Sequence, residues 1–214
     1  MTHRPLSGAL IAVGTVALSL GILAFLLDVA GWIRMPFTLT FVSLPGLLVV
    51  VVLAVYTRRA DETLVWSRLK HGLAAGLAAT VVYDALRGAV QLSGLFSYNA
   101  FRAIPLFGSL ITGLEPASVP AALAGWAYHF WNGISFAMMY ALIAAGRPWL
   151  WGLGWAMFLE AAMVLTYPVA FGVPRSDAGF LSISFIGHAA YGIVLGLWIQ
   201  RLGRPSRQAV GVVA

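Results

Sequence analysis

Apolar residues fill six long segments of this chain, and short runs with basic or turn-forming residues separate them. A helix of about 20 apolar residues crosses the hydrocarbon core of a membrane, and each segment reaches that length. The pattern predicts an all-α polytopic membrane protein, a bundle of six transmembrane helices that forms a single domain over residues 1–214. The predicted helices cover residues 6–27, 37–56, 69–92, 121–145, 149–171 and 179–200.

An ionisable residue interrupts each of the last four segments: Asp84, His129, Glu160 and His188. With a rise of about 1.5 Å per residue, Glu160 and His188 fall near the middle of their helices, and the other two fall about 6 Å toward one side. Four ionisable groups on four helices are therefore expected in one thin layer. An ionised group at the centre of a bilayer costs at least ~2.5 kcal/mol, so a functional role is the default expectation.

Further polar residues lie three or four positions from these four, and this spacing puts them on the same helical faces. A polar stripe on a membrane helix must face the bundle interior or a water-filled cavity. We therefore expect His129, Glu160 and His188 to point into one shared cavity, with Asp84 at its outer edge. The additional predicted polar lining is Asn132, Arg87, Tyr191 and Tyr140.

Two imidazoles and one or two carboxylates are ligands that suit zinc, manganese or iron. The residues thus predict a metal site formed by His129, His188 and Glu160. Glu160 and Asp84 are the candidate catalytic groups, acting on a lipid-soluble small molecule. No two of these ligands share a helix, so no local motif supports the site.

Three alternatives stay open, and with them the question of whether the protein is an enzyme. His129 and His188 could ligate a b-type haem. The ionisable layer could form a proton relay in a proton-coupled transporter of small solutes or ions. The stripes could also only hold helices together, in a homo-oligomer or an accessory subunit of a membrane complex. No Walker loop, dinucleotide fingerprint, HExxH or GxSxG motif points to another chemistry.

The segment 93–120, between the third and fourth predicted helices, is long but apolar. Leucine, isoleucine, phenylalanine and tyrosine recur through it. A helical piece at the membrane interface, or one that re-enters the bundle, fits this composition better than a solvated loop.

Composition supports the membrane assignment, because 61% of the residues are hydrophobic and only 9% are charged. Soluble domains carry roughly 25% charged residues. The formal net charge of +6 does not indicate nucleic-acid binding, since the basic residues lie between apolar segments. The absence of cysteine excludes disulfides and thiolate metal sites.

The distribution of basic residues predicts the orientation, because lysine and arginine collect on the cytoplasmic side. With six helices, nine of the thirteen basic residues fall on the side of the two termini. Both termini are therefore expected in the cytoplasm, and the protein in a plasma membrane of bacterial type. The nine are Arg4, Arg58, Arg59, Arg68, Lys70, Arg147, Arg201, Arg204 and Arg207, against Arg34, Arg87, Arg102 and Arg175.

This orientation predicts the outcome of a reporter experiment. A reporter fused after Ala214 should be active in the cytoplasm, and one inserted within residues 93–120 should be active on the opposite side. Two reporters are used, one active only in the cytoplasm and one active only outside it. Each is placed at both positions, and its activity is measured. Activity of both fusions on one side would mean that the helix count is wrong.

Overall fold

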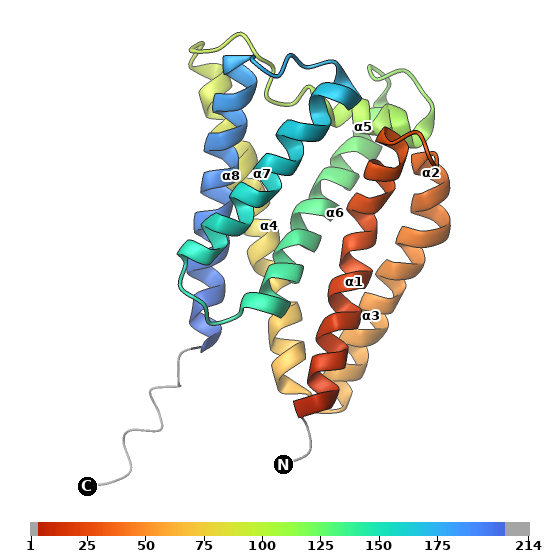
Figure 1. Ribbon diagram of the computed structural model, residues 1–214, viewed down its shortest axis with the longest axis vertical. Coiled ribbons are helices and arrows are strands. Elements are labelled where there is room, and N and C mark those ends of the chain that lie inside the picture. The colour runs from red at the N-terminus through yellow and green to blue at the C-terminus, as the bar shows by residue number, and fades with distance from the viewer. Residues whose placement is uncertain (1–3, 204–214) are drawn as a thin grey trace, which may run out of the picture.

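The computed structural model describes residues 4–203, with side chains from residue 6 to residue 202. This part of the chain is helical and holds no strand (Figure 1). The long helices run up and down the molecule, so that the start of α1 and the end of α8 lie at the same end (Figure 1). The elements are α1 (Arg4–Val29), α2 (Met35–Thr38), a π turn (Leu39–Ser43), α3 (Leu44–Arg59), α4 (Thr63–Leu92), α5 (Ala103–Thr112), α6 (Val119–Ala144), α7 (Leu150–Phe171), α8 (Ala178–Ile199) and a 3₁₀ turn (Gln200–Gly203).

Five helical stretches of the described chain are long and apolar enough to cross a membrane, as expected of a membrane protein. The remaining long helix, α6, has 26 residues and is not among these five. His129 and Asn132 lie in its middle and lower its hydropathy. Five of the six predicted spans thus meet the requirements of a membrane helix. The five are Leu6–Val29, Met35–Arg59, Thr63–Leu92, Leu150–Phe171 and Ala178–Leu202.

The second predicted span consists of α2, the π turn and α3 in direct succession. Pro45 explains the interruption, because it has no N–H to donate to the carbonyl one turn before it. A wide π turn ends at Ser43, two residues before the proline. The Ser43 hydroxyl, in that turn, donates a hydrogen bond to the Leu20 carbonyl of α1 at 2.7 Å.

The apolar segment between α4 and α6 contains the ten-residue helix α5, which packs against α6 and α2. Ten residues extend only about 15 Å, half the thickness of the hydrocarbon core. Gly113, with φ of 71°, ends α5, and the Ser118 side chain accepts from the Ala121 N–H at the start of α6. The segment therefore contains a short ordered helix at one end of the bundle (Figure 1).

Several basic residues near the ends of the long helices lie at one end of the molecule. Arg58 and Arg59 end α3, Arg147 lies between α6 and α7, and Arg201 follows α8. All of these lie at the end of the molecule where α1 begins (Figure 1). Arg204, Arg207 and the side chain of Arg4 lie outside the described residues.

Close packing of α4 against α6 depends on glycines of α4. A Cβ at Gly72 would lie 2.8 Å from Met138 Cα, and one at Gly76 would lie 2.8 Å from both Ile134 Cα and Ala137 Cβ. Small residues allow membrane helices to approach in this way. This contact sets the distance between Asp84 on α4 and His129 on α6.

A second close contact joins α7 to α8. A Cβ at Gly192 would lie 2.7 Å from both Ala156 Cβ and the Gly152 carbonyl oxygen. The two helices pack along their length, and this brings Glu160 on α7 beside His188 on α8.

The α4–α6 contact predicts that Gly76→Val destabilises the protein. The added side chain would overlap the α6 backbone, and overpacking of this kind costs about 1–3 kcal/mol. Gly154→Val is the matched control, because a Cβ at Gly154 meets nothing within 4 Å. Thermal unfolding in detergent should show a lower Tm for Gly76→Val alone; equal effects of the two substitutions would contradict the packing argument.

Candidate functional site

The first polar pair joins α4 to α6. His129 Nε2 lies 2.9 Å from Asp84 Oδ2 and 3.1 Å from Oδ1, and both side chains are largely buried. With Asp84 ionised, Nε2 carries the hydrogen and donates it to the carboxylate. The other ring nitrogen, Nδ1, makes no hydrogen bond with the described residues.

The second polar pair joins α7 to α8. His188 Nδ1 lies 2.7 Å from Glu160 Oε2 and 3.0 Å from the Ser184 carbonyl oxygen. The Ser184 hydroxyl donates to the same Glu160 oxygen at 2.5 Å. A carboxylate and a carbonyl only accept, so Nδ1 carries the hydrogen. Nε2 of His188 is therefore the nitrogen left for another partner.

Tyr83 of α4 lies between the two pairs. Its ring centroid is 5.9 Å from that of His129 and 5.0 Å from that of His188, the latter in an edge-to-face arrangement. Tyr83 is only 8% exposed. The two pairs thus lie on either side of one buried aromatic ring, in one layer of the bundle.

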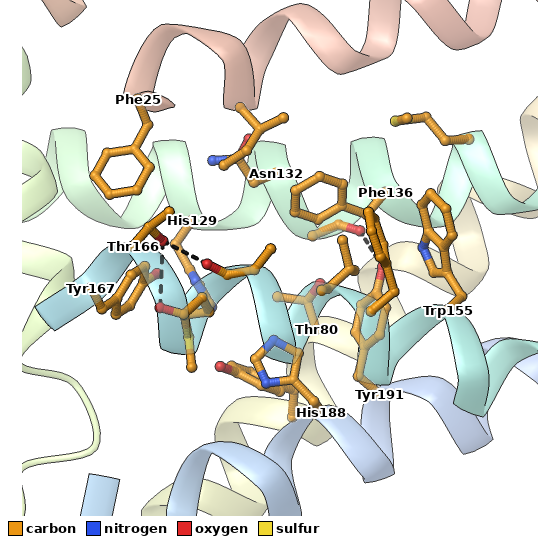
Figure 2. A pocket seen from close by; sticks show the side chains of 18 of the residues that line it. Phe25, Thr80, His129, Asn132, Phe136, Trp155, Thr166, Tyr167, His188 and Tyr191 are labelled. Atoms are coloured by element: carbon orange, nitrogen blue, oxygen red, sulfur yellow. Dashed lines mark hydrogen bonds between the residues drawn. The ribbon is translucent and has the colours of Figure 1, made fainter. Parts of the chain in front are cut away.

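Both histidines line a cavity of about 290 Å³ enclosed by α1, α4, α6, α7 and α8, with Phe107 of α5 at one end. We call it the main cavity. Figure 2 shows the imidazoles of His129 and His188 among the aromatic side chains of its wall. The rest of the wall is mostly apolar; its aromatic members include Phe25, Tyr83, Phe136, Trp155, Phe158 and Tyr167.

Three buried polar atoms on this wall have no hydrogen-bond partner among the described residues: Thr80 Oγ1, Asn132 Oδ1 and Trp155 Nε1. Thr80 is 1% exposed. Buried polar groups in proteins are nearly always hydrogen-bonded, to protein, water or a ligand. These atoms leave hydrogen-bonding capacity on the wall that the described residues do not use.

The two carboxylates do not line the main cavity. Asp84 and Glu160 lie behind the histidines, each holding one ring nitrogen. The histidines lie as predicted, whereas Glu160 does not point into the shared cavity. The reason is its short bond to Ser184 and His188, which turns the carboxylate toward α8.

The donor set predicted for a metal is divided between the two pairs. No group of three or more histidine, cysteine, aspartate or glutamate side chains within the described residues could hold a metal ion together. The arrangement of His129, His188 and Glu160 thus gives the metal prediction no support. The haem alternative gains none either, because Asp84 holds Nε2 of His129.

The other predicted lining residues separate into three groups. Asn132 and Tyr191 line the main cavity, and the Tyr191 hydroxyl donates to the Gly133 carbonyl at 2.6 Å. Tyr140 is buried behind the wall, with its ring 6.4 Å from that of Trp155. Arg87 does not line the main cavity and donates to the Ala100 carbonyl instead.

A comparison with protein families identifies a relationship for most of the chain. A family described as of unknown function, DUF6789, matches residues 66–210. The chain belongs to this family. The matched region contains Asp84, His129, Glu160 and His188, and it leaves α1 to α3 outside.

No curated protein and no solved structure matches the chain. The family carries no functional description, so the function must be argued from the residues of the site.

Sequence reasoning missed two residues of the site. Tyr83 is three residues after Thr80 and four residues before Arg87, and this spacing puts it on the same face of α4. The sequence therefore contained the signal that identifies Tyr83. Trp155 is the other such residue. Nothing in the sequence distinguishes it from Trp149 or Trp151, because only the packing of α7 turns it toward the cavity.

The paired geometry predicts energetic coupling within each pair and none between pairs. Asp84→Asn and His129→Gln should each lower the free energy of unfolding. Their effects should fall short of additivity by about 0.5–3 kcal/mol, because each removes the same interaction. Asp84→Asn combined with His188→Gln is the matched control and should be close to additive. Unfolding of the variants in detergent measures both cycles; additive effects of Asp84→Asn and His129→Gln would contradict the pairing.

Proposed function

We propose that this protein binds a lipid-soluble small molecule within the membrane and exchanges protons with its polar group. The observation that carries the proposal is that the histidines of both histidine–carboxylate pairs line one mostly apolar cavity. Small-molecule sites typically have this character, with few polar groups that converge on an apolar space. The unpartnered atoms of Thr80 and Asn132 add hydrogen-bonding capacity to the same wall.

Proton exchange follows from the free nitrogen of each imidazole. Histidine is the usual general acid or base near neutral pH. When Nε2 of His188 accepts a proton from a bound molecule, the resulting imidazolium stays 2.7 Å from Glu160. The carboxylate compensates a charge that the apolar surroundings would otherwise disfavour. Asp84 serves His129 in the same way, so both carboxylates act as positioning groups behind the histidines.

The proposal includes a sixth membrane span, α6, with both termini in the cytoplasm and α5 at the outer interface. The 26 residues of α6 extend about 39 Å, more than the hydrocarbon thickness of about 30 Å. Its polar residues face other helices and the cavity rather than lipid. The bias of basic residues supports the orientation.

Access from the bilayer supports a lipid-soluble ligand. Leu26 of α1 and Phe158 of α7 both line the main cavity, and their exposed fractions are 40% and 63%. Apolar residues exposed on a membrane helix contact lipid chains. A molecule dissolved in the bilayer can therefore reach the cavity between α1 and α7 without crossing a polar surface.

Proton-coupled transport is the second candidate, and one packing feature favours it. The main cavity separates α7 from α1 and α6, with which α7 makes few contacts, whereas α7 packs tightly on α8. Movement of α7 relative to α1 would open the cavity to one side. Pyranine-loaded proteoliposomes would report protons carried with an added lipophilic acid.

The predicted metal site is independent of this proposal. Elemental analysis of the purified protein for zinc, manganese and iron tests that earlier prediction separately.

The proposal predicts that a brominated long-chain alcohol quenches Trp155, whose ring lines the main cavity. In nanodiscs the wild type should show saturable quenching that Trp155→Phe removes. Ala162→Phe should weaken binding about tenfold or more, because its ring would fill space in the cavity.

Ala161→Phe is the control for this measurement. Ala161 neighbours Ala162 on α7 and is exposed, but it lines neither cavity. Quenching that is unsaturable, or equally affected by both alanine substitutions, would mean that the alcohol contacts the protein only from the surrounding lipid.

A further inference from the structure

A buried arginine near the main cavity forms no ion pair with the described residues. Arg87 is 8% exposed, and no carboxylate oxygen of the described residues lies within ion-pair distance of it. One terminal nitrogen donates to the Ala100 carbonyl, and Nε has no partner. The guanidinium carbon lies 4.4 Å from the ring centroid of Tyr83 and 5.1 Å from that of Phe101. Asp84 attracts this cation from one turn away, but its carboxylate makes its hydrogen bonds to His129. No carboxylate contacts the guanidinium, so the guanidinium is left to pair with an anion.

Arg87 lines a second, small cavity of about 40 Å³ beneath α5, together with Tyr98 and Ser184. A water molecule needs about 10–15 Å³ of such space, so the small cavity has room for about three waters or one carboxyl group. A glycerophosphate headgroup would not fit.

The small cavity adjoins the main cavity. Five residues line both: Tyr83, Phe107, His129, Met163 and Tyr167. A polar, positively charged space and a larger apolar space are thus separated by a shared wall that includes one of the two histidines.

Gly187 of α8 holds the arginine in this position. A Cβ there would lie 2.8 Å from both Arg87 Cδ and Tyr83 Cε2. The close approach of α8 presses the arginine stem against Tyr83 and directs the guanidinium toward the small cavity.

We propose that the ligand is a single-chain amphiphile with a carboxylic acid head. Its carboxylate pairs with Arg87 in the small cavity, and its hydrocarbon chain occupies the main cavity. This inference rests on the proposed function and names the ligand class. The planar fork of a guanidinium matches a carboxylate, which favours this head over other anions.

The proton of the acid has a defined acceptor. The acid enters from the bilayer in its neutral form, R–COOH. Its O–H bond breaks, and the proton moves to His129, whose Nδ1 is free and whose Nε2 stays bonded to Asp84. The products are the carboxylate beside Arg87 and an imidazolium beside Asp84, so no net charge enters the membrane.

Tyr98 supplies a further donor at the small cavity. Burial raises the pKa of its phenol, although Arg102 and Arg87 oppose the shift. The phenol therefore stays protonated and can donate a hydrogen bond to the bound carboxylate.

The test compares dibromostearic acid with its methyl ester, which has the same chain but no acid group, by quenching of Trp155 in nanodiscs. In the wild type the acid should bind roughly tenfold to hundredfold more tightly than the ester, as expected for hydrogen bonds to a charged partner. Arg87→Met should reduce this ratio to about one, and Arg87→Lys should retain part of it. Arg102→Met, which removes an exposed arginine that lines neither cavity, should leave it unchanged.

Each outcome separates this inference from the proposed function. Equal binding of acid and ester by the wild type would overturn the assignment of an acid head, while the lipid-soluble site would stand. Quenching by neither compound nor by the brominated alcohol would overturn both. Should Arg87→Met fail to fold, the wild-type ratio of acid to ester still decides the question.

Discussion

An ionised side chain in hydrocarbon needs an opposite charge beside it, and the histidine–carboxylate pairs meet this need across helices. Asp84 and His129 lie on α4 and α6, and Glu160 and His188 lie on α7 and α8. Within each pair a proton can move with little change in net charge. The same bonds that hold the helices together thus leave one nitrogen of each imidazole available to the main cavity.

The pairs depend in turn on the close approach of helix backbones. Gly76 brings α4 against α6, and Gly192 brings α8 against α7. A larger residue at either position would separate the helices, and a hydrogen bond of about 2.9 Å weakens steeply with such a displacement. The tightly packed glycines and the loosely packed cavity are therefore parts of one arrangement, in which α7 touches α8 closely and α1 only lightly.

Much of this arrangement follows from the sequence, because hydrophobic length and a period of 3.6 residues fix helices and their faces. Every predicted span coincides with helix in the structure, and the predicted faces bring the ionisable residues into one layer. The partner of each histidine could not be predicted in this way. Glu160 pairs with His188 because α7 packs on α8, a relationship between helices that the pattern along one helix does not contain. Arg87 illustrates the same limit: Asp84 is one turn away, yet α8 and Tyr83 direct the guanidinium elsewhere.

The family match includes some residues of the site and leaves others outside. The ionisable residues and Tyr83 lie within residues 66–210, whereas Ile22, Phe25 and Leu26 of α1 lie outside it. The α1 residues form an apolar side of the main cavity, and the Tyr128 hydroxyl of α6 holds α1 in place by donating to the Gly21 carbonyl at 3.0 Å. The residues to which we assign proton exchange therefore belong to the matched part of the chain, and α1 forms an apolar side of the proposed binding space. Since Leu26 is also exposed, the same helix would border the proposed entrance from the bilayer as well as the cavity wall.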